Sequence, residues 1–121
     1  MNRIFLFDTY AILEIINGNE NYKQYLNDEI IINNFIFAEL CYKLIRENQS
    51  GANYFVDKYK DFISHVDSSV IKEAMAFRVK HKTKKLSMTD CISYIMSVRM
   101  GIKFLTGDKE FEMFKNVEFV K

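Results

Sequence analysis

The 121-residue chain contains no proline, four glycines and two cysteines, and each scarcity narrows what it can be. Without proline, the ends of helices and strands must be read from glycine, asparagine, aspartate and serine. Cys41 and Cys91 lie in apolar stretches typical of helices, without Cys-x-x-Cys or Cys/His ligand spacing. This pattern predicts reduced thiols in the core of a cytoplasmic protein rather than a disulfide or a zinc site.

Long apolar runs are also missing. Asp8 and Glu14 interrupt the apolar beginning of the chain too early for a signal peptide, and no window approaches the roughly 20 apolar residues of a membrane span. Repeats, low-complexity tracts and linkers are absent as well, which predicts one domain over residues 1–121. The net charge of +1 does not identify a partner, so the distribution of charge along the chain matters more.

Short apolar or β-branched runs alternate with amphipathic stretches along the whole chain. The runs predict strands at residues 3–7, 30–32, 63–66, 102–105 and 117–120. The stretches between them predict helices at residues 9–17, 20–27, 34–48, 52–62, 68–80 and 87–101, with a short helix from residue 108. Strands separated by helices predict an α/β fold with a central parallel sheet of four to five strands and helices on both faces.

Four acidic residues stand where such a fold brings side chains to one edge of the sheet. Asp8 directly follows the first predicted strand, and Asp108 closely follows the strand at residues 102–105. Ligands of open α/β sheets bind at this carboxyl edge. Glu39 and Asp90 lie in predicted helices, and the residues around Glu39 are mostly apolar, as expected for a paired, protonated or metal-bound carboxylate.

Each acid also has a structural interpretation. Asp8 and Asp108 can cap the helices that follow them, and Asp90 can complement the dipole of its own helix. Taken together, four converging carboxylates repel one another by up to about 4 kcal/mol per close pair, so they require a cation. Oxygen ligands favour Mg²⁺ or Mn²⁺, and such a site typically activates water against a phosphodiester. Thr9 and Thr106 can hold a carboxylate or a water there, or can serve as ordinary turn hydroxyls.

The helix that carries Asp90 has two small polar residues, Ser93 and Ser97, on nearly the same face. Small side chains allow a neighbouring element to approach closely. A solvated helix face explains the same spacing, and amphipathicity alone does not separate the two interpretations.

Four short motifs occur in order and at suitable spacing along the chain: FDTYAIL at residues 7–13, AEL at 38–40, TDCI at 89–92 and LTGDKEF at 105–111. They resemble the motifs of PIN-domain ribonucleases. The resemblance covers nearly the whole chain, and the size is most similar to that of VapC-type toxins of toxin–antitoxin pairs. One departure is Asn33-Asn34, which stands where a Ser or Thr often precedes the helix that carries the Glu.

The resemblance implies a PIN-like three-layer sandwich and an endoribonuclease that depends on Mg²⁺ or Mn²⁺. It also implies a small antitoxin partner and a homodimer. Its catalytic and metal-binding acids map onto Asp8, Glu39, Asp90 and Asp108, with Thr106 as the accompanying hydroxyl. The alternative is a catalytically silent PIN-like module that binds protein or RNA. An aspartyl phosphatase is disfavoured, because the Asp-x-Asp-x-Thr pattern fails at Tyr10.

Basic residues crowd into one stretch after the predicted helix at residues 68–80. Four of them are candidates for contacts with RNA phosphates: Lys80, Lys82, Lys84 and Lys85. A solvated basic loop explains the same composition. The aromatic residues, in contrast, do not interleave with basic ones, so they predict core or dimer packing rather than base stacking.

Overall fold

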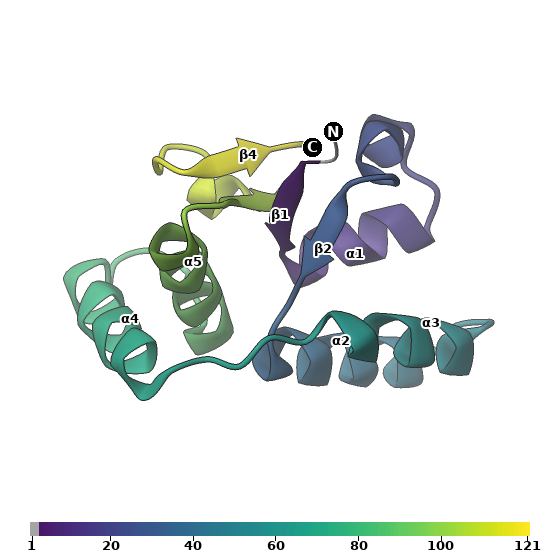
Figure 1. Cartoon of the computed structure of the whole chain (residues 1–121), viewed down its shortest axis with the longest axis horizontal. Helices are drawn as coiled ribbons and strands as arrows, with labels where there is room; N and C mark the ends of the chain where they lie inside the picture. The colour runs from purple at the N-terminus through teal and green to yellow at the C-terminus, as the bar shows by residue number, and fades with distance from the viewer. Residues whose placement is uncertain (1–2) are drawn as a thin grey trace.

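A computed structural model describes residues 3–121, so residues 1 and 2 of the predicted domain lie outside the described residues. A four-stranded parallel sheet forms its centre, with the strand order β2-β1-β3-β4 (Figure 1). The strands are β1 (Ile4–Phe7), β2 (Glu29–Ile31), β3 (Lys103–Thr106) and β4 (Val117–Phe119). The predicted α/β class and the parallel sheet of four to five strands are therefore confirmed.

Helices connect these strands. The α-helices are α1 (Thr9–Ile16), α2 (Asn34–Arg46), α3 (Ala52–Tyr59), α4 (Ser68–Lys80) and α5 (Met88–Met100). Three short 3₁₀ helices complete the chain: η1 (Glu20–Tyr25), η2 (Lys60–Phe62) and η3 (Lys109–Phe111). The predicted helices at 20–27 and from residue 108 thus form as single 3₁₀ segments, and the one at 52–62 ends as a 3₁₀ turn.

Alternation along the strands assigns the two faces of the sheet. Phe5 packs edge-on against Tyr25 of η1, whereas Phe104 packs against Tyr94 of α5. Leu6 is in register with Phe104, so Leu6 shares the α5 face and Phe5 lies on the other. The sheet is therefore covered by η1 on one face and by α5 on the other. Figure 1 shows α4 alongside α5, and α3 alongside α2 below the sheet.

The strand predicted at residues 63–66 is wrong. Ile63 makes one isolated parallel bridge to Ile32, and the chain then runs extended to α4 without a further ladder. Its apolar residues Ile63 and Val66 pack against the core from the edge of the sheet, beyond β2. The β-branched pattern therefore reports burial here, but not a strand.

The small residues of α5 mark close packing. Ser93 and Ser97 are both fully buried, which excludes the solvated-face interpretation. Ser97 donates to the carbonyl of Tyr94, and Ser93 accepts a hydrogen bond of 3.1 Å from the side-chain amide of Asn33. Cys91 is buried as predicted, while Cys41 is half-buried, and both are free thiols.

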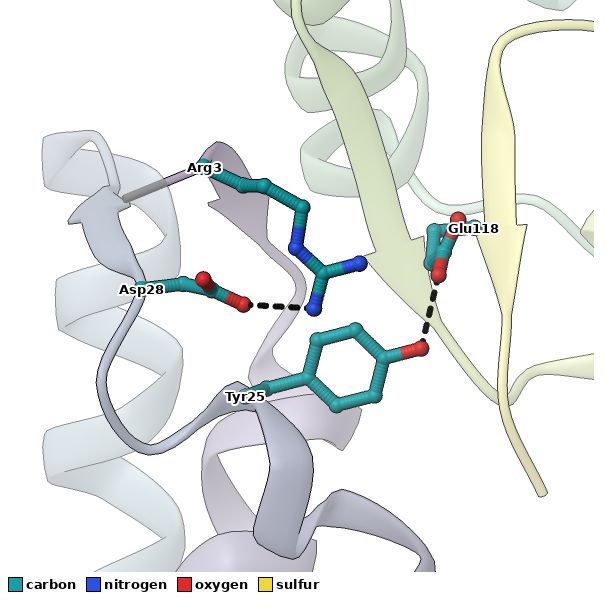
Figure 2. A network of polar contacts seen from close by, with 4 residues as sticks. All are labelled: Arg3, Tyr25, Asp28 and Glu118. Atoms are coloured by element: carbon teal, nitrogen blue, oxygen red, sulfur yellow. Dashed lines mark hydrogen bonds and ion pairs between the residues drawn. The ribbon is translucent and has the colours of Figure 1, made fainter. Parts of the chain in front are cut away.

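At the beginning of β1, a polar network joins segments that are far apart in the sequence (Figure 2). Arg3 forms an ion pair of 2.9 Å with Asp28, and its guanidinium lies over the rings of Phe5 and Tyr25. The Tyr25 hydroxyl donates to Glu118 of β4 at 2.7 Å. The network thus fastens η1 across the sheet, and each of its acids has a hydrogen-bond donor.

Candidate active site

The strand order places a topological switch point between β1 and β3. From β1 the chain crosses to β2 on one side, and β3 occupies the other side. The carboxyl ends of β1 and β3 are joined at this point, because the Asp8 amide donates to the Leu105 carbonyl at 2.9 Å. Ligands of open α/β sheets bind at such a point. Asp8 and the turn after Thr106 therefore lie at the expected position for a site.

Thr106 links the two aspartates of this edge. It is fully buried, and its hydroxyl donates to Asp8 Oδ2 at 2.7 Å. The same hydroxyl accepts from the Asp108 amide at 3.1 Å. The turn after it is closely packed, since a Cβ on Gly107 would lie 2.2 Å from the Val120 carbonyl oxygen and 2.3 Å from the Tyr10 ring. The turn therefore requires glycine, and it holds Asp108 in place beside Asp8.

All four predicted acids line one hollow of about 440 Å³, which we call the acid hollow. Its lining consists of Asp8, Thr9, Tyr10, Leu13, Glu14, Asn17, Glu39, Lys43, Ser87, Asp90 and Asp108. These residues come from α1, α2, the beginning of α5 and the turn after β3. The sequence thus predicted which acids meet, while Thr106 lies beneath them and is buried.

Two of the three aspartates, Asp90 and Asp108, also have the structural role at a helix N-terminus that the sequence allowed for them. Asp90 Oδ2 accepts from the Ser87 amide at 2.9 Å within a capping box, and Asp108 Oδ1 accepts from the Glu110 amide at 3.0 Å. Among the described residues, Asp8 makes no side-chain cap for α1. A carboxylate has two oxygens and about four acceptor positions. Each aspartate therefore keeps acceptor capacity for a ligand.

Burial sets the electrostatics of the site. Burial, followed by the neighbouring charge of Asp90, raises the pKa of Asp8 from about 3.8 to about 7, against the lowering effect of the Thr106 hydrogen bond. Burial also raises the pKa of Asp90, against two hydrogen bonds from Ser87 that lower it. Both shifts disfavour ionised carboxylates in this hollow. A cation bound there would reverse that preference.

The chemistry of the donors suits a hard divalent cation, although the ligands are not fully assembled. Within residues 3–121, no three acidic, histidine or cysteine side chains already surround a common metal position. The acids line one hollow, but they stand further apart than the tight cluster expected from the sequence. Thr9 is among the residues that line the same hollow, and its buried hydroxyl lacks a hydrogen-bond partner within the described residues. A buried polar group of this kind is normally satisfied by water or a ligand.

The helix that carries Glu39 is held by the residue that departs from the PIN pattern. Asn33 is fully buried and caps α2 by accepting from the Ile36 amide at 2.9 Å. Its amide group donates to Ser93 of α5. Asn33 thus does what a capping Ser or Thr does, and it also ties the helix of Glu39 to the helix of Asp90. Glu39 itself is half-buried, with Ala38 and Tyr42 exposed beside it, so its surroundings are more solvated than the sequence predicted.

The predicted basic residues do not line the acid hollow. Lys80, Lys82, Lys84 and Lys85 are all exposed, at the end of α4 and in the loop before α5. The loop is nevertheless fastened near the site, because the Lys85 amide donates to Glu110, whose own amide donates to Asp108. Their role in binding RNA stays a prediction.

Sequence reasoning missed two charged residues of the acid hollow, Glu14 and Lys43. Helical spacing carries the signal for both. Lys43 follows Glu39 by four residues on α2, and Glu14 follows Tyr10 by four on α1, so each shares a face with a residue of the site.

Comparisons with known proteins agree with this fold. Three solved structures share the fold. The crystal structure of Mycobacterium tuberculosis VapC20, described as a sarcin-ricin loop cleaving toxin, has a TM-score of 0.80 at 18% identity, covering 98% of this chain and 99% of that chain. A toxin–antitoxin complex from Klebsiella pneumoniae has a TM-score of 0.75 at 19% identity, covering 93% and 94%. VapBC2 from Rickettsia felis, bound to a promoter DNA fragment, has a TM-score of 0.69 at 16% identity, covering 98% and 99%.

At these identities the likeness shows the fold alone, and it confirms the predicted similarity to VapC-type structures. A comparison with curated protein sequences gave no match. None of the helices formed by residues 3–121 has both the length and the apolarity to cross a membrane. The family model for the PIN domain matches residues 5–118, nearly the full length of the sequence and all four acids. The chain belongs to the PIN domain family.

Proposed function

We propose that this protein is an endoribonuclease that depends on Mg²⁺ or Mn²⁺ and hydrolyses RNA phosphodiester bonds at the acid hollow. The observation that carries the proposal is the position of Asp8. It is buried at the switch point of the sheet with a pKa raised to about 7, and three further acids line the same hollow. Membership of the PIN domain family supports the same activity. Perturbed, clustered carboxylates in a hollow are typical of catalytic sites.

The fit to a divalent cation rests on the oxygen donors. Asp8, Glu39, Asp90 and Asp108 would hold the cation, and the Thr9 hydroxyl offers a further polar contact. When bound, Mg²⁺ or Mn²⁺ would supply charge neutralisation and Lewis acidity toward the scissile phosphate. Thr106 would fix the orientation of the Asp8 carboxylate through its hydrogen bond to Oδ2. Glu39, half-buried and facing the hollow from α2, is placed to orient the attacking water and accept its proton.

Hydrolysis in this scheme needs no side-chain nucleophile. The water oxygen forms a bond to phosphorus, the bond from phosphorus to the leaving ribose oxygen breaks, and that oxygen takes up a proton. Within the hollow, the nucleophile candidates Thr9 and Ser87 have no histidine or lysine base as a hydrogen-bond partner among the described residues. Water activation by carboxylates is therefore the chemistry that the residues support best.

We further propose that the protein is the toxin of a toxin–antitoxin pair, with a small antitoxin as its partner, and that it forms a homodimer. Support comes from the similar Klebsiella pneumoniae and Rickettsia felis structures, whose descriptions name toxin–antitoxin and VapBC assemblies. Large apolar side chains are also exposed on α2 and α3, among them Tyr42, Ile45 and Tyr54. A short neighbouring reading frame that restores growth when coexpressed would support the toxin assignment, and growth unaffected by the protein alone would contradict it.

The direct test is cleavage of RNA. Incubating tRNA, rRNA and mRNA with the protein and Mn²⁺ should give discrete fragments, and a chelator should abolish them. Mn²⁺ should also raise the melting temperature of the protein, because a ligand of the folded state stabilises it. RNA binding without cleavage, together with an unchanged melting temperature, would contradict the nuclease and favour the catalytically silent module.

A further inference from the structure

The acid hollow continues into a second hollow between α1 and α2. The second hollow measures about 490 Å³, and it shares three lining residues with the first: Leu13, Asn17 and Lys43. Leu44 and Arg46 near the end of α2 also line it, together with Glu47 and Gln49 from the loop that follows. We call it the α1–α2 hollow. Since the two hollows share a wall, an extended chain bound at the acids can run directly into it.

Lys43 stands at the boundary between the two hollows. In the part of the chain that the structure describes, it is the one lysine or arginine in the lining of the acid hollow, which it shares with five acidic residues: Asp8, Glu14, Glu39, Asp90 and Asp108. It is half-buried, yet it forms no ion pair within residues 3–121. Since no direct ion pair holds its ammonium group to one of these carboxylates, Lys43 can make a charge-assisted contact with an anionic ligand.

Several other cations of the described chain already have partners, and the exposed lysines at the end of α4 and in the loop after it do not line either hollow. Arg46 pairs with Glu47 at 2.8 Å, Arg3 with Asp28 and Arg99 with Glu73. Lys121, which also lies near the acids, donates to the Gly107 carbonyl at 3.2 Å and rests on the Tyr10 ring. Lys84 rests on Phe114. Lys43 is therefore the cation best placed to receive a phosphate next to the acid hollow.

The helix sets the spacing between Lys43 and the acids. Lys43 follows Glu39 by one turn, so it lies about 6 Å further along the same face of α2. This separation is comparable with the distance between neighbouring phosphates of a single strand. A phosphate held at the acids thus places the next one beside Lys43. The amide groups of Asn17 and Gln49 then line the path of the adjoining nucleotide, where they can meet base or sugar edges.

We propose that Lys43 binds the RNA phosphate next to the scissile one, and that the strand leaves the acid hollow through the α1–α2 hollow. The inference rests on the proposed ribonuclease function and names the residue that positions its substrate. Lys43 acts by orienting the strand, while the carboxylates perform the reaction. Single-stranded RNA fits this path, because only a flexible strand can follow two joined hollows on one side of a sheet.

The test compares Lys43→Met with Lys43→Arg and with a matched control, Lys72→Met, on the exposed surface of α4. Lys43→Met should raise KM for RNA about tenfold and leave kcat within about threefold, as expected for the loss of one charge-assisted contact. Lys43→Arg should restore KM. Lys72→Met should behave as the unmodified protein. Melting temperatures near that of the unmodified protein would show that each variant is folded.

A binding readout separates this inference from the proposed activity. With Asp8→Asn as the background, RNA binds without being cut, and Lys43→Met should reduce the dependence of log Kd on log salt by about 0.7, the value for one phosphate contact of a single strand. Unchanged KM and an unchanged slope in Lys43→Met would overturn the role of Lys43 while the nuclease assignment stands. An unmodified protein that cuts no RNA with Mn²⁺ would overturn the nuclease assignment, and the salt slope would still test Lys43.

Discussion

Two groups of acids in this molecule differ in the partners that surround them. In the network of Figure 2, Asp28 has an arginine at 2.9 Å and Glu118 has a tyrosine hydroxyl at 2.7 Å. The acid hollow is lined by five acidic residues, and the hydrogen bonds that its aspartates accept come from neutral donors, the Thr106 hydroxyl and the Ser87 and Glu110 amides. The paired acids stabilise the fold, whereas the hollow retains uncompensated charge that is useful only when a cation and a substrate arrive.

The first prediction compares two variants, each of which neutralises one acid from one of the two groups. Asp8→Asn should lower the rate of RNA cleavage by at least about a thousandfold, because it removes a central oxygen donor of the site. It should leave the metal-free protein as stable as before or more stable, since a buried charge is lost. Asp28→Asn should retain the cleavage rate and lower the melting temperature slightly, because its ion pair with Arg3 is partly exposed.

Cleavage assays and thermal melting on the two variants check this pair of predictions. Asp8→Glu offers a further control, because it keeps the negative charge of the carboxylate but moves its two oxygens by one methylene. Cleavage at the unmodified rate by Asp8→Asn would refute the assignment of the acid hollow.

The second prediction concerns pH. Since the pKa of Asp8 is raised from about 3.8 to about 7 by folding, the folded protein binds a proton more tightly than the unfolded chain does. The contribution of Asp8 to stability is thus fully present below about pH 4 and is lost as the pH rises toward about 7. The loss amounts to a few kcal/mol for this residue. Urea unfolding in chelator between pH 4 and pH 8 measures it.

Two comparisons isolate the effect of Asp8 from that of other groups. In Asp8→Asn the decline between pH 4 and pH 7 should be smaller, and Mn²⁺ should reduce it in the unmodified protein. A decline of equal size in Asp8→Asn would mean that other groups cause it.

The third prediction tests the scaffold of the acid hollow, where Asn33 joins the helices that carry Glu39 and Asp90. Asn33→Ala should cost about 1 to 3 kcal/mol of stability, because α2 loses its cap and the buried Ser93 loses its donor. Asn33→Ser should recover the cap, and with it much of the loss. Chemical unfolding measures both variants, and an unchanged midpoint in Asn33→Ala would show that the buried hydrogen bonds contribute little.

The sequence indicated that Asp8 and Asp108 lie at one edge of the sheet because both follow strands. Asp8 follows a run of four apolar residues, and a parallel sheet brings that end of the strand beside Asp108 whatever the helices do. Most element ends were also predictable, since Gly18 and Gly101 end α1 and α5 with positive φ, and Asn33 and Ser87 cap the helices that they precede.

The features that the sequence did not predict depend on how the elements pack against one another in the folded chain. Residues 63–66 carry a strand-like pattern, but they lie past β2, where only Ile63 finds a bridge. Lys43 was not singled out, because helical spacing places it on the same face as Glu39 but does not tell that this face of α2 meets α1. The partner of Asn33 could not be read either, since Ser93 is 60 residues away and the contact exists only after α2 and α5 have docked.

The close approach around Gly107 has a consequence for how the site is kept in shape. Its missing side chain lets the β4 end of the chain, through Val120, and the first turn of α1, through Tyr10, press on the same turn from two sides. The residues at the end of β4 therefore help to fix the position of the Asp108 carboxylate in the acid hollow. A substitution that loosens the packing of Val120 would therefore displace Asp108 before it disrupts the hydrophobic core.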